Sequence, residues 1–251
     1  MGTVFLVGAG PGSPDLLTLR AAKLLKRADV VFHDALVHPE TLALAAQARQ
    51  VAVGKRCGRL STAQRFINKQ LIEACRHHDV VVRLKGGDPM LFGRAQEEID
   101  ALRAAGIQIE VVPGVSAALS ASADVGQSLT ERGISRSVLF VTPRFGIGES
   151  EHDWARPAST ADTVALYMAS QQASAISEGL IAAGVPASRP AVFVENASLA
   201  SRQVIATRVG TLTVAAKKLG SGPALLLIGD VYQDIAAAAE LQYNAAISAI
   251  A

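Results

Sequence analysis

The chain has 251 residues, of which 50% are apolar and 18% are charged, and its formal net charge is +2. This composition excludes a disordered tail protein and a highly charged nucleic-acid coat. An aromatic content of 4% also argues against a surface on which single-stranded nucleic acid would stack. Cys57 and Cys75 are the two cysteines, too few for a disulfide framework or a four-ligand zinc site, so we expect reduced thiols.

The first half of the chain alternates short apolar runs with helix-length segments. Strands are expected at residues 3–7, 30–32, 51–53, 80–84 and 109–112, and helices at 14–26, 40–47, 61–75 and 91–105. Ser13 is suited to cap the first of these helices, and Pro14 to be its first residue. Ser61 is likewise expected to cap the third.

The second half repeats this alternation. Strands are expected at residues 137–141, 163–167, 191–194, 204–207 and 224–228, helices at 117–123, 173–183, 211–219 and 235–241, and an exposed loop at 143–160. Such alternation with continuous apolar strands predicts an α/β fold with sheets covered on both faces. The length fits one large domain or two domains of about 120 residues. The expected boundary at Pro113-Gly114 favours two, an N-terminal domain of residues 1–113 and a C-terminal domain of residues 114–251.

No segment approaches the roughly 20 consecutive apolar residues that a membrane-spanning helix needs. The apolar run at the N-terminus is too short for a signal peptide. We therefore expect a cytoplasmic protein with neither a membrane nor a nucleic-acid partner.

Five polar or glycine-rich clusters directly follow predicted strands. They are residues 8–12, Asp34, Gly54-Lys55-Arg56, Gly86-Gly87-Asp88-Pro89 and residues 113–117. Because ligands of α/β sheets bind at the carboxyl ends of strands, these clusters predict a common ligand site. Taken singly, Asp88 could be an ordinary turn cap, and Arg94 and Glu97 could be an ordinary surface ion pair.

The first glycine cluster is similar to a dinucleotide fingerprint but departs from it. Ser13 occupies the position of the last glycine, and Pro11 removes a backbone N–H from a loop that would hold a pyrophosphate. Asp34 could still imitate the acid that binds a ribose. A nicotinamide-dependent oxidoreductase therefore stays as a disfavoured alternative.

Several motifs together resemble the uroporphyrinogen-III C-methyltransferases, a branch of the tetrapyrrole methylases. They are Val7-Gly8-Ala9-Gly10-Pro11-Gly12, Val53-Gly54-Lys55-Arg56, Val82-Arg83-Leu84-Lys85-Gly86-Gly87-Asp88-Pro89 and Val112-Pro113-Gly114-Val115-Ser116-Ala117-Ala118. Tyr167-Met168, Val194-Glu195-Asn196 and Gly222-Pro223-Ala224-Leu225 continue the resemblance, which covers residues 2–231. The Gly-Ala-Gly-Pro-Gly element is shared by the wider family, whereas the second and third motifs are more specific to this branch.

The resemblance implies two α/β domains with the active site in the cleft between them, and a homodimer. It implies S-adenosylmethionine as the methyl donor, no metal, and uroporphyrinogen III as the acceptor. The implied reaction methylates carbons 2 and 7 through precorrin-1 to precorrin-2, in the branch that leads to siroheme, cobalamin or haem d1. Some relatives carry an added dehydrogenase and ferrochelatase segment; because the first strand here begins at residue 3, neither NAD use nor iron insertion is expected.

The resemblance also implies roles for single residues. Asp34 is the candidate base or orienting acid, and Lys55 is the candidate proton donor. Glu97 matches a position that takes part in proton handling, and the choice among Asp34, Arg94 and Glu97 for that role stays open. The implied substrate-binding residues are Arg56, Arg94, Arg132 and Met168. The implied cofactor-binding residues are Pro11, Gly86, Gly87, Asp88, Leu91, Ser116, Ala117, Met168, Ala197 and Ala224. Taken alone, Asp34 could be a helix cap, Lys55 a solvated lysine and Met168 a core residue.

The implied substrate carries eight carboxylates and therefore needs fixed cations, for which arginine is well suited. Six cations, Lys55, Arg56, Arg83, Lys85, Arg94 and Arg132, are expected to form a funnel for this anionic substrate.

The chain departs from the branch pattern near the expected substrate. Ala95-Gln96 stand where two glycines are usual, and Ser128 and Glu131 stand where a proline and a histidine are usual. These departures leave open another precorrin methyltransferase with a different acceptor. A non-catalytic module that keeps the cofactor pocket is the other alternative, against which Asp34, Lys55 and Arg94 argue.

Overall fold

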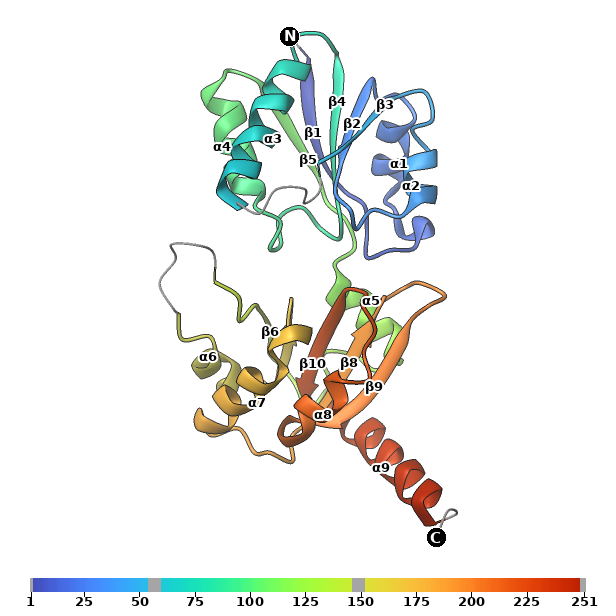
Figure 1. Ribbon diagram of the computed structural model, residues 1–251, viewed down its shortest axis with the longest axis vertical. Helices are drawn as coiled ribbons and strands as arrows, with labels where there is room; N and C mark the ends of the chain where they lie inside the picture. The colour runs from blue at the N-terminus through green and yellow to red at the C-terminus, as the bar shows by residue number, and fades with distance from the viewer. Residues whose placement is uncertain (1, 54–59, 146–151, 249–251) are drawn as a thin grey trace. The chain divides into compact units, whose positions relative to one another are not determined.

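The computed structural model describes residues 2–53, 60–145 and 152–248. The chain divides into two units, Met1–Ala117 (unit 1) and Ala118–Ala251 (unit 2), as Figure 1 shows by colour. The expected boundary lay at Pro113-Gly114, and the roles expected of the two domains stay predictions.

In its described residues, unit 1 is a five-stranded parallel sheet with two helices on each face. Its strands are β1 (Thr3–Gly8), β2 (Val30–His33), β3 (Arg49–Ala52), β4 (Val80–Lys85) and β5 (Gln108–Val112), in the order β3-β2-β4-β1-β5, and its helices are α1 (Leu19–Leu25), α2 (Pro39–Ala43), α3 (Leu60–Ala74) and α4 (Ala95–Ala104). Every strand anticipated in this half is present to within two or three residues at each end.

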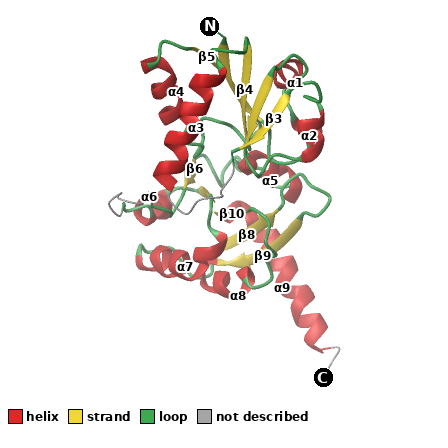
Figure 2. Cartoon of the chain, turned by 45° about the horizontal axis from the view of Figure 1, so that its top comes forward, coloured by secondary structure: helices red, strands yellow, loops and turns green. Residues whose placement is uncertain are grey.

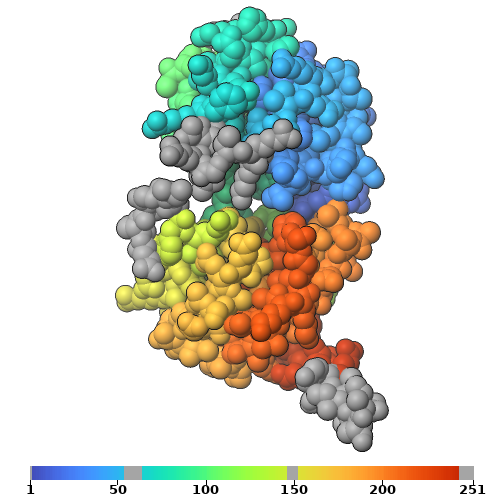
Figure 3. Space-filling view, viewed as in Figure 1, coloured from blue at the N-terminus to red at the C-terminus, as the bar shows by residue number. Residues whose placement is uncertain are grey.

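Side chains that alternate along β1 separate the two faces of this sheet. Phe5 and Val7 pack against α1 and the residues around α2, whereas Val4 and Leu6 pack against α3 and α4, as period-2 alternation requires. Figure 2 shows α3 and α4 side by side, and Figure 3 shows α1, α2 and their loops as one continuous blue surface. A sheet covered on both faces is therefore confirmed for unit 1.

The helix expected at residues 14–26 is shorter than predicted. Pro14–Leu16 form only a 3-10 turn, and α1 begins at Leu19. Thr18 is the true N-cap because its backbone is extended and its side-chain oxygen accepts a hydrogen bond from the N–H of Ala21 at 3.1 Å. Ser13 makes no such capping bond.

The helix expected at residues 91–105 also begins late, at Ala95. Phe92 and Arg94 have φ angles of 53° and 54°, in the left-handed region that interrupts an α-helix. The segment after β4 is therefore a loop. Similarly, α3 begins at Leu60, so Ser61 is not its N-cap.

Unit 2 holds a mixed sheet. Its strands are β6 (Val138–Val141), β7 (Thr163–Leu166), β8 (Pro190–Glu195), β9 (Gln203–Arg208) and β10 (Ala224–Gly229), in the order β6-β7-β10-β8-β9, and its helices are α5 (Ala117–Val125), α6 (Ala155–Thr160), α7 (Ala173–Ala182), α8 (Leu212–Ala216) and α9 (Gln233–Ser248). β6 and β7 are parallel, whereas β10 runs antiparallel to both β7 and β8.

Both faces of the unit 2 sheet are covered as well. Leu226 and Phe193 pack among residues of α6, α7 and α8, whereas Leu227 and Val192 pack among residues of α5 and the segment leading into α9. Helix α6 lies inside the segment expected to be an exposed loop, so that expectation was wrong for Ala155–Thr160. The α/β fold class is confirmed. In the described part of the chain, no helix combines the length and apolar character needed to cross a bilayer.

Candidate functional site

The carboxyl ends of all five unit 1 strands lie at one edge of the sheet because the strands are parallel. This edge therefore gathers the clusters that follow β1, β2, β4 and β5. The predicted site residues placed there are Pro11, Asp34, Gly86, Gly87, Asp88, Leu91, Ser116 and Ala117. Lys55 and Arg56 follow β3 but lie outside the described residues.

Three loops at this edge touch through their backbones. Gly10 and Gly87 form a β-bridge, with the N–H of Gly87 donating to the carbonyl of Gly10 at 2.6 Å. A Cβ atom on Gly8 would lie 2.6 Å from the Cα of Gly114 and 2.7 Å from the carbonyl oxygen of Gly87. The glycines at these positions are thus required by the close approach of the loops.

Asp88 joins two of these loops through its side chain. Its Oδ1 accepts a hydrogen bond from the N–H of Met90 at 2.8 Å, and its Oδ2 accepts one from the N–H of Gly114 at 3.0 Å. Asp88 therefore does cap its own turn, as an ordinary turn cap would. Its second bond, to the loop of Gly114, was not predicted from the sequence.

We expect Asp88→Asn to lower the free energy of unfolding by about 1–3 kcal/mol, because an amide NH2 would face one of two backbone donors. Asp100→Asn is the matched control, since Asp100 is exposed and bonds only the side chain of Gln96 among the described contacts. Urea unfolding of both variants measures the difference. Equal losses in the two variants would contradict the role of Asp88.

The first glycine loop does not open a helix. Gly10 and Gly12 are followed by a 3-10 turn, and α1 begins only at Leu19. A dinucleotide fingerprint places its glycines at the N-terminus of the following helix, where the pyrophosphate binds. This geometry adds to the sequence argument against a nicotinamide-dependent oxidoreductase.

Arg83 and Lys85 belong to a buried ionic network. Both point from β4 toward α4, and their side chains are 3% and 4% exposed. Arg83 Nε donates to Glu98 Oε1 at 3.1 Å, and Lys85 Nζ lies 3.1 Å from both carboxylate oxygens of Glu98. The expectation that these two cations line a substrate funnel is therefore wrong, because their charges are already paired inside unit 1.

Sequence reasoning missed Glu98. Its side chain is fully buried on α4, beside Ala95, Ile99 and Leu102 on the apolar stripe. The sequence spacing could have revealed it, because position 98 lies three residues after Ala95 and four before Leu102, which places Glu98 on the same buried helix face. A carboxylate on a buried stripe requires a cationic partner.

Burial and the nearby charge of Arg83 hold the pKa of Lys85 below its ordinary value of 10.5, although Glu98 acts in the opposite direction. Between the lowered pKa and 10.5 the unfolded chain binds more protons than the folded chain, so stability rises with pH in that window. We expect Lys85→Met to lack this rise. Urea unfolding of the unchanged chain and of Lys85→Met at several pH values between about 7 and about 10 tests this prediction. The same dependence of the free energy of unfolding on pH in both proteins would contradict it.

Asp34 lies just after β2 and is 31% exposed. Its Oδ1 accepts a hydrogen bond from Nη2 of Arg83 at 2.6 Å. One side of the carboxylate is thus held by the buried network, while the residue reaches the edge where the glycine loops meet. This placement suits a group that must touch a ligand in a fixed orientation.

Arg94 and Glu97 form a bidentate ion pair. Arg94 Nε and Nη2 donate to the two carboxylate oxygens of Glu97 at 2.6 and 2.7 Å. The guanidinium, through these hydrogen bonds, holds the pKa of Glu97 below its usual range. Both side chains are partly exposed, so the pair adds little stability.

Three predicted cofactor residues share one edge of the unit 2 sheet. Met168 follows β7, Ala197 follows β8, and Ala224 begins β10, which runs antiparallel to both. Met168 is 42% exposed, so the alternative of an ordinary core methionine is wrong. Buried Glu195 fixes this edge by accepting from the N–H groups of Gly220 and Gly222.

Arg132 is not brought to that edge. It lies in the turn closed by the bridge between Glu131 and Ser135, and the hydroxyl of Ser135 bonds that of Thr163 at the amino end of β7. Arg132 therefore lies at the opposite end of β7 from Met168. The side chain of Glu131 accepts a hydrogen bond from Gln127 at 3.0 Å.

Left-handed backbone marks the same segments. The non-glycine residues with positive φ in the described part of the chain are Phe92, Arg94, Met168, Asn196 and Ser198. Arg94 and Met168 are predicted site residues, and the other three adjoin Leu91 or Ala197. Such strained conformations cluster at functional sites.

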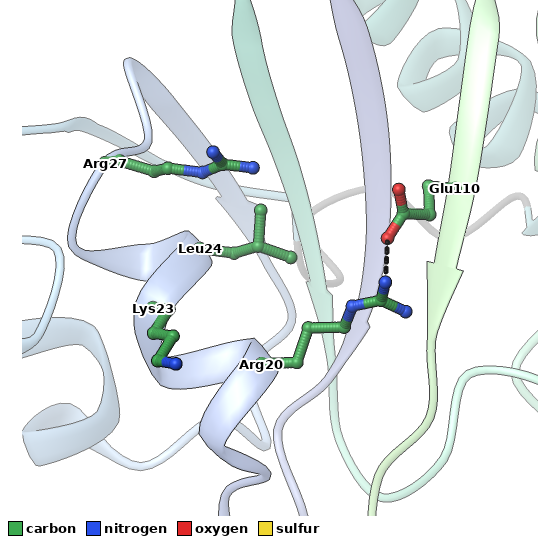
Figure 4. Close-up of a pocket in the computed structure, with 5 residues that line it drawn as sticks. All are labelled: Arg20, Lys23, Leu24, Arg27 and Glu110. Atoms are coloured by element: carbon green, nitrogen blue, oxygen red, sulfur yellow. Dashed lines mark ion pairs between the residues drawn. The ribbon is translucent and has the colours of Figure 1, made fainter.

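A pocket of about 450 Å³ lies on unit 1 between α1 and β5. Figure 4 shows its lining: Arg20, Lys23, Leu24 and Arg27 from α1 and its end, and Glu110 from β5. Arg20 pairs with Glu110 at 3.5 Å. None of the predicted site residues lines this pocket, so it is separate from the carboxyl edge.

Comparison with known proteins agrees with these motifs. Residues 3–213 match the profile of the family described as Tetrapyrrole (Corrin/Porphyrin) Methylases. The chain is 43% identical over 235 residues to a uroporphyrinogen-III C-methyltransferase of Pseudomonas aeruginosa, covering 93% of this chain and 96% of the relative. It is 42% identical over 233 residues to siroheme synthase 1 of Cronobacter sakazakii, covering 92% of this chain and 49% of the relative.

A solved structure is also similar. Uroporphyrin-III C-methyl transferase of Thermus thermophilus, complexed with S-adenyl homocysteine, superposes with a TM-score of 0.80 at 38% identity, covering 92% of this chain and 99% of that one. The chain spans about half the length of the siroheme synthases that it matches. The resemblance found in the sequence is confirmed: the chain belongs to the tetrapyrrole methylase family.

Proposed function

We propose that the chain is an S-adenosylmethionine-dependent C-methyltransferase that converts uroporphyrinogen III through precorrin-1 to precorrin-2. The observation that carries the proposal is the carboxyl edge of unit 1, where the glycine motif of the wider family meets Gly86-Gly87-Asp88-Pro89, which belongs to a motif more specific to this branch. Three glycine loops touch there through their backbones, and the carboxylate of Asp34 is fixed beside them. Relatives that bear the name of this activity support the acceptor.

The glycine loops fit a large cofactor that is bound through backbone atoms. A Cβ at Gly8 or Gly114 would collide with backbone atoms of a neighbouring loop, so the loops present their backbones at close range, and Gly87, with a φ of 68°, takes a left-handed conformation. Pro11, Gly86, Gly87, Asp88, Leu91, Ser116 and Ala117 from unit 1, with Met168, Ala197 and Ala224 from unit 2, are the proposed cofactor residues. When bound, S-adenosylmethionine supplies the methyl group.

The residues of this chain have three tasks in the proposed reaction. They align the acceptor carbon of the substrate, bind the carboxylates of the substrate and accept the proton that leaves it after methylation. The carboxylate of Asp34 or of Glu97 is the proposed acceptor of this proton, and Lys55 remains the proposed proton donor. Because the ion pair with Arg94 lowers the pKa of Glu97, Glu97 is ionised near neutral pH and is a weak base.

Arg56, Arg94, Arg132 and Met168 are the proposed substrate residues. The role of Arg132 rests on the resemblance alone. The protein is proposed to be a cytoplasmic homodimer in the branch that leads to siroheme, cobalamin or haem d1, in keeping with the siroheme synthase relatives.

The test is an anaerobic assay of the chain with S-adenosylmethionine and uroporphyrinogen III, read by mass spectrometry. A product that is two methyl groups heavier is expected. Binding of S-adenosylmethionine without methyl transfer would contradict the acceptor and favour another precorrin methyltransferase, a reading to which the departures at Ser128 and Glu131 point. Binding of NAD in place of S-adenosylmethionine would contradict the activity as a whole.

We expect Arg132→Ala to raise the KM for uroporphyrinogen III about tenfold or more, because a charge-assisted hydrogen bond to a carboxylate is worth about 1.5–3 kcal/mol. The dissociation constant for S-adenosylmethionine should not change. Arg136→Ala, in the same loop, is the matched control and should leave both constants unchanged. An unaltered KM in Arg132→Ala would remove Arg132 from the substrate site.

A further inference from the structure

The guanidinium of Arg83 is held on three sides. Its Nε donates to Glu98 Oε1 at 3.1 Å, its Nη1 to the carbonyl of Leu84 at 3.2 Å, and its Nη2 to Asp34 Oδ1 at 2.6 Å. A planar guanidinium bonded in three directions cannot rotate without breaking one of these bonds. Arg83 therefore presents a donor to Asp34 at a fixed point in space.

Glu98 is itself held from several elements. Lys85 of β4 bonds both of its carboxylate oxygens, and Gln64 of α3 donates to Oε1 at 3.1 Å. Two cations and two anions, counting Asp34, balance the charge of the network. A continuous chain of contacts thus runs from α3 and α4, through Glu98 and Arg83, to Asp34 at the carboxyl edge.

Asp34 needs such support because it lies in a loop. Its carbonyl accepts from Val37 in a turn after β2, and loop side chains sample several rotamers unless a partner fixes them. Arg83 and Glu98 are buried and do not reach the edge themselves. Arg83 bonds Asp34 directly, and Glu98 reaches Asp34 through Arg83.

We propose that Arg83 and Glu98 are positioning residues: Glu98 fixes the guanidinium of Arg83, and Arg83 fixes the carboxylate of Asp34 for proton transfer. Lys85 holds the carboxylate of Glu98 from the other side, through hydrogen bonds to both of its oxygens. This inference rests on the proposed function of Asp34 and extends it, because it explains why the basic residues of the Arg83-Leu84-Lys85 segment face inward and not toward the substrate.

The test is a double-mutant cycle in the full chain with Arg83→Lys, Asp34→Asn and both changes together. Arg83→Lys keeps the positive charge but removes the planar guanidinium that bonds Glu98, Leu84 and Asp34 together. The methyl-transfer rate at saturating S-adenosylmethionine, the dissociation constant of S-adenosylmethionine and the urea midpoint are measured for each protein. Arg76→Lys is the control, because Arg76 pairs with Glu73 on the surface, away from the network.

We expect Arg83→Lys to lower the rate about 10- to 100-fold, as misplacement of a reacting group does, with cofactor affinity unchanged. In the Asp34→Asn background the same change should have no further effect, because the two residues act as a unit. If Asp34→Asn leaves no measurable rate, the comparison is made in the Asp34→Glu background, where Arg83→Lys should have a smaller effect than in the unchanged chain, because the longer side chain no longer meets Arg83 at the same point. Arg76→Lys should match the unchanged chain throughout.

Two results would overturn the inference while leaving the proposed function intact. One is an unchanged rate in Arg83→Lys, and the other is a loss in the Asp34 background equal to that in the unchanged chain, which would show that Arg83 acts independently of Asp34. If Arg83→Lys shifts the urea midpoint, the rate is compared at equal folded fraction, and a rate that then equals that of the unchanged chain also overturns it. Absence of product with the unchanged chain would instead contradict the proposed function, and the inference with it.

Discussion

Glu98→Gln is expected to lower the free energy of unfolding by about 3–5 kcal/mol, because it removes the carboxylate shared by two buried cations. Glutamine keeps the size of the side chain and one acceptor oxygen, so the loss reports the charge and not the packing. Arg83 and Lys85, both nearly inaccessible to water, would then have only Asp34 as a counter-charge. Urea unfolding measures the loss.

Glu73→Gln is the matched control for this prediction. Glu73 is exposed and pairs with Arg76 at 2.7 Å on the surface of α3, so its loss should cost less than about 1 kcal/mol. The double change Lys85→Met with Glu98→Gln should recover part of the stability, because Arg83 and Asp34 alone are again balanced. A similar cost for Glu73→Gln and Glu98→Gln would contradict the importance of the buried network.

Gly114→Ala is expected to weaken binding of S-adenosylhomocysteine about 10- to 100-fold, equivalent to about 1.4–2.8 kcal/mol. A Cβ at this position would collide with the carbonyl oxygen of Gly87 and lie 2.9 Å from the Cα of Gly8. These are backbone atoms, which cannot turn aside as a flexible side chain can. The loops must therefore separate, and the overpacking should also cost about 1–3 kcal/mol of stability.

Gly106→Ala separates steric from conformational effects. Gly106 also lies in unit 1, with a φ of 71°, and a Cβ atom added to it would meet nothing within 4 Å. Alanine there adds only the strain of left-handed backbone, about 1–2 kcal/mol. Isothermal titration with S-adenosylhomocysteine should show unchanged affinity for this control. Unchanged affinity in Gly114→Ala as well would contradict the assignment of the glycine loops to the cofactor.

Much of the fold could be predicted because it depends on patterns of apolar and polar residues that are close together in the sequence. The continuous apolar runs identified every strand that the described residues of both units contain, and the glycine and acidic clusters after them identified the carboxyl edge of unit 1. The helix starts were less certain, because Ser13 and Thr18 are both good caps by type. Only the backbone conformation shows that Thr18 caps α1.

The site could be predicted in part for the same reason. The positions of Asp34, Gly87 and Asp88 follow from strand ends that the sequence reveals. The direction of a side chain across the sheet is a different matter, because alternation on β4 separates its two faces without saying what covers each face. Arg83 and Lys85 therefore looked like substrate cations until Glu98 was found opposite them.

The sequence by itself thus determined the fold class, the family and the loops that meet at the carboxyl edge, since these depend on residue type and spacing along the chain. The tertiary structure alone decided which charges are free to meet a substrate. It paired two of the six expected cations, Arg83 and Lys85, with a buried carboxylate. Charge pairing depends on distances between residues remote in sequence, and a net charge of +2 contains no information about them.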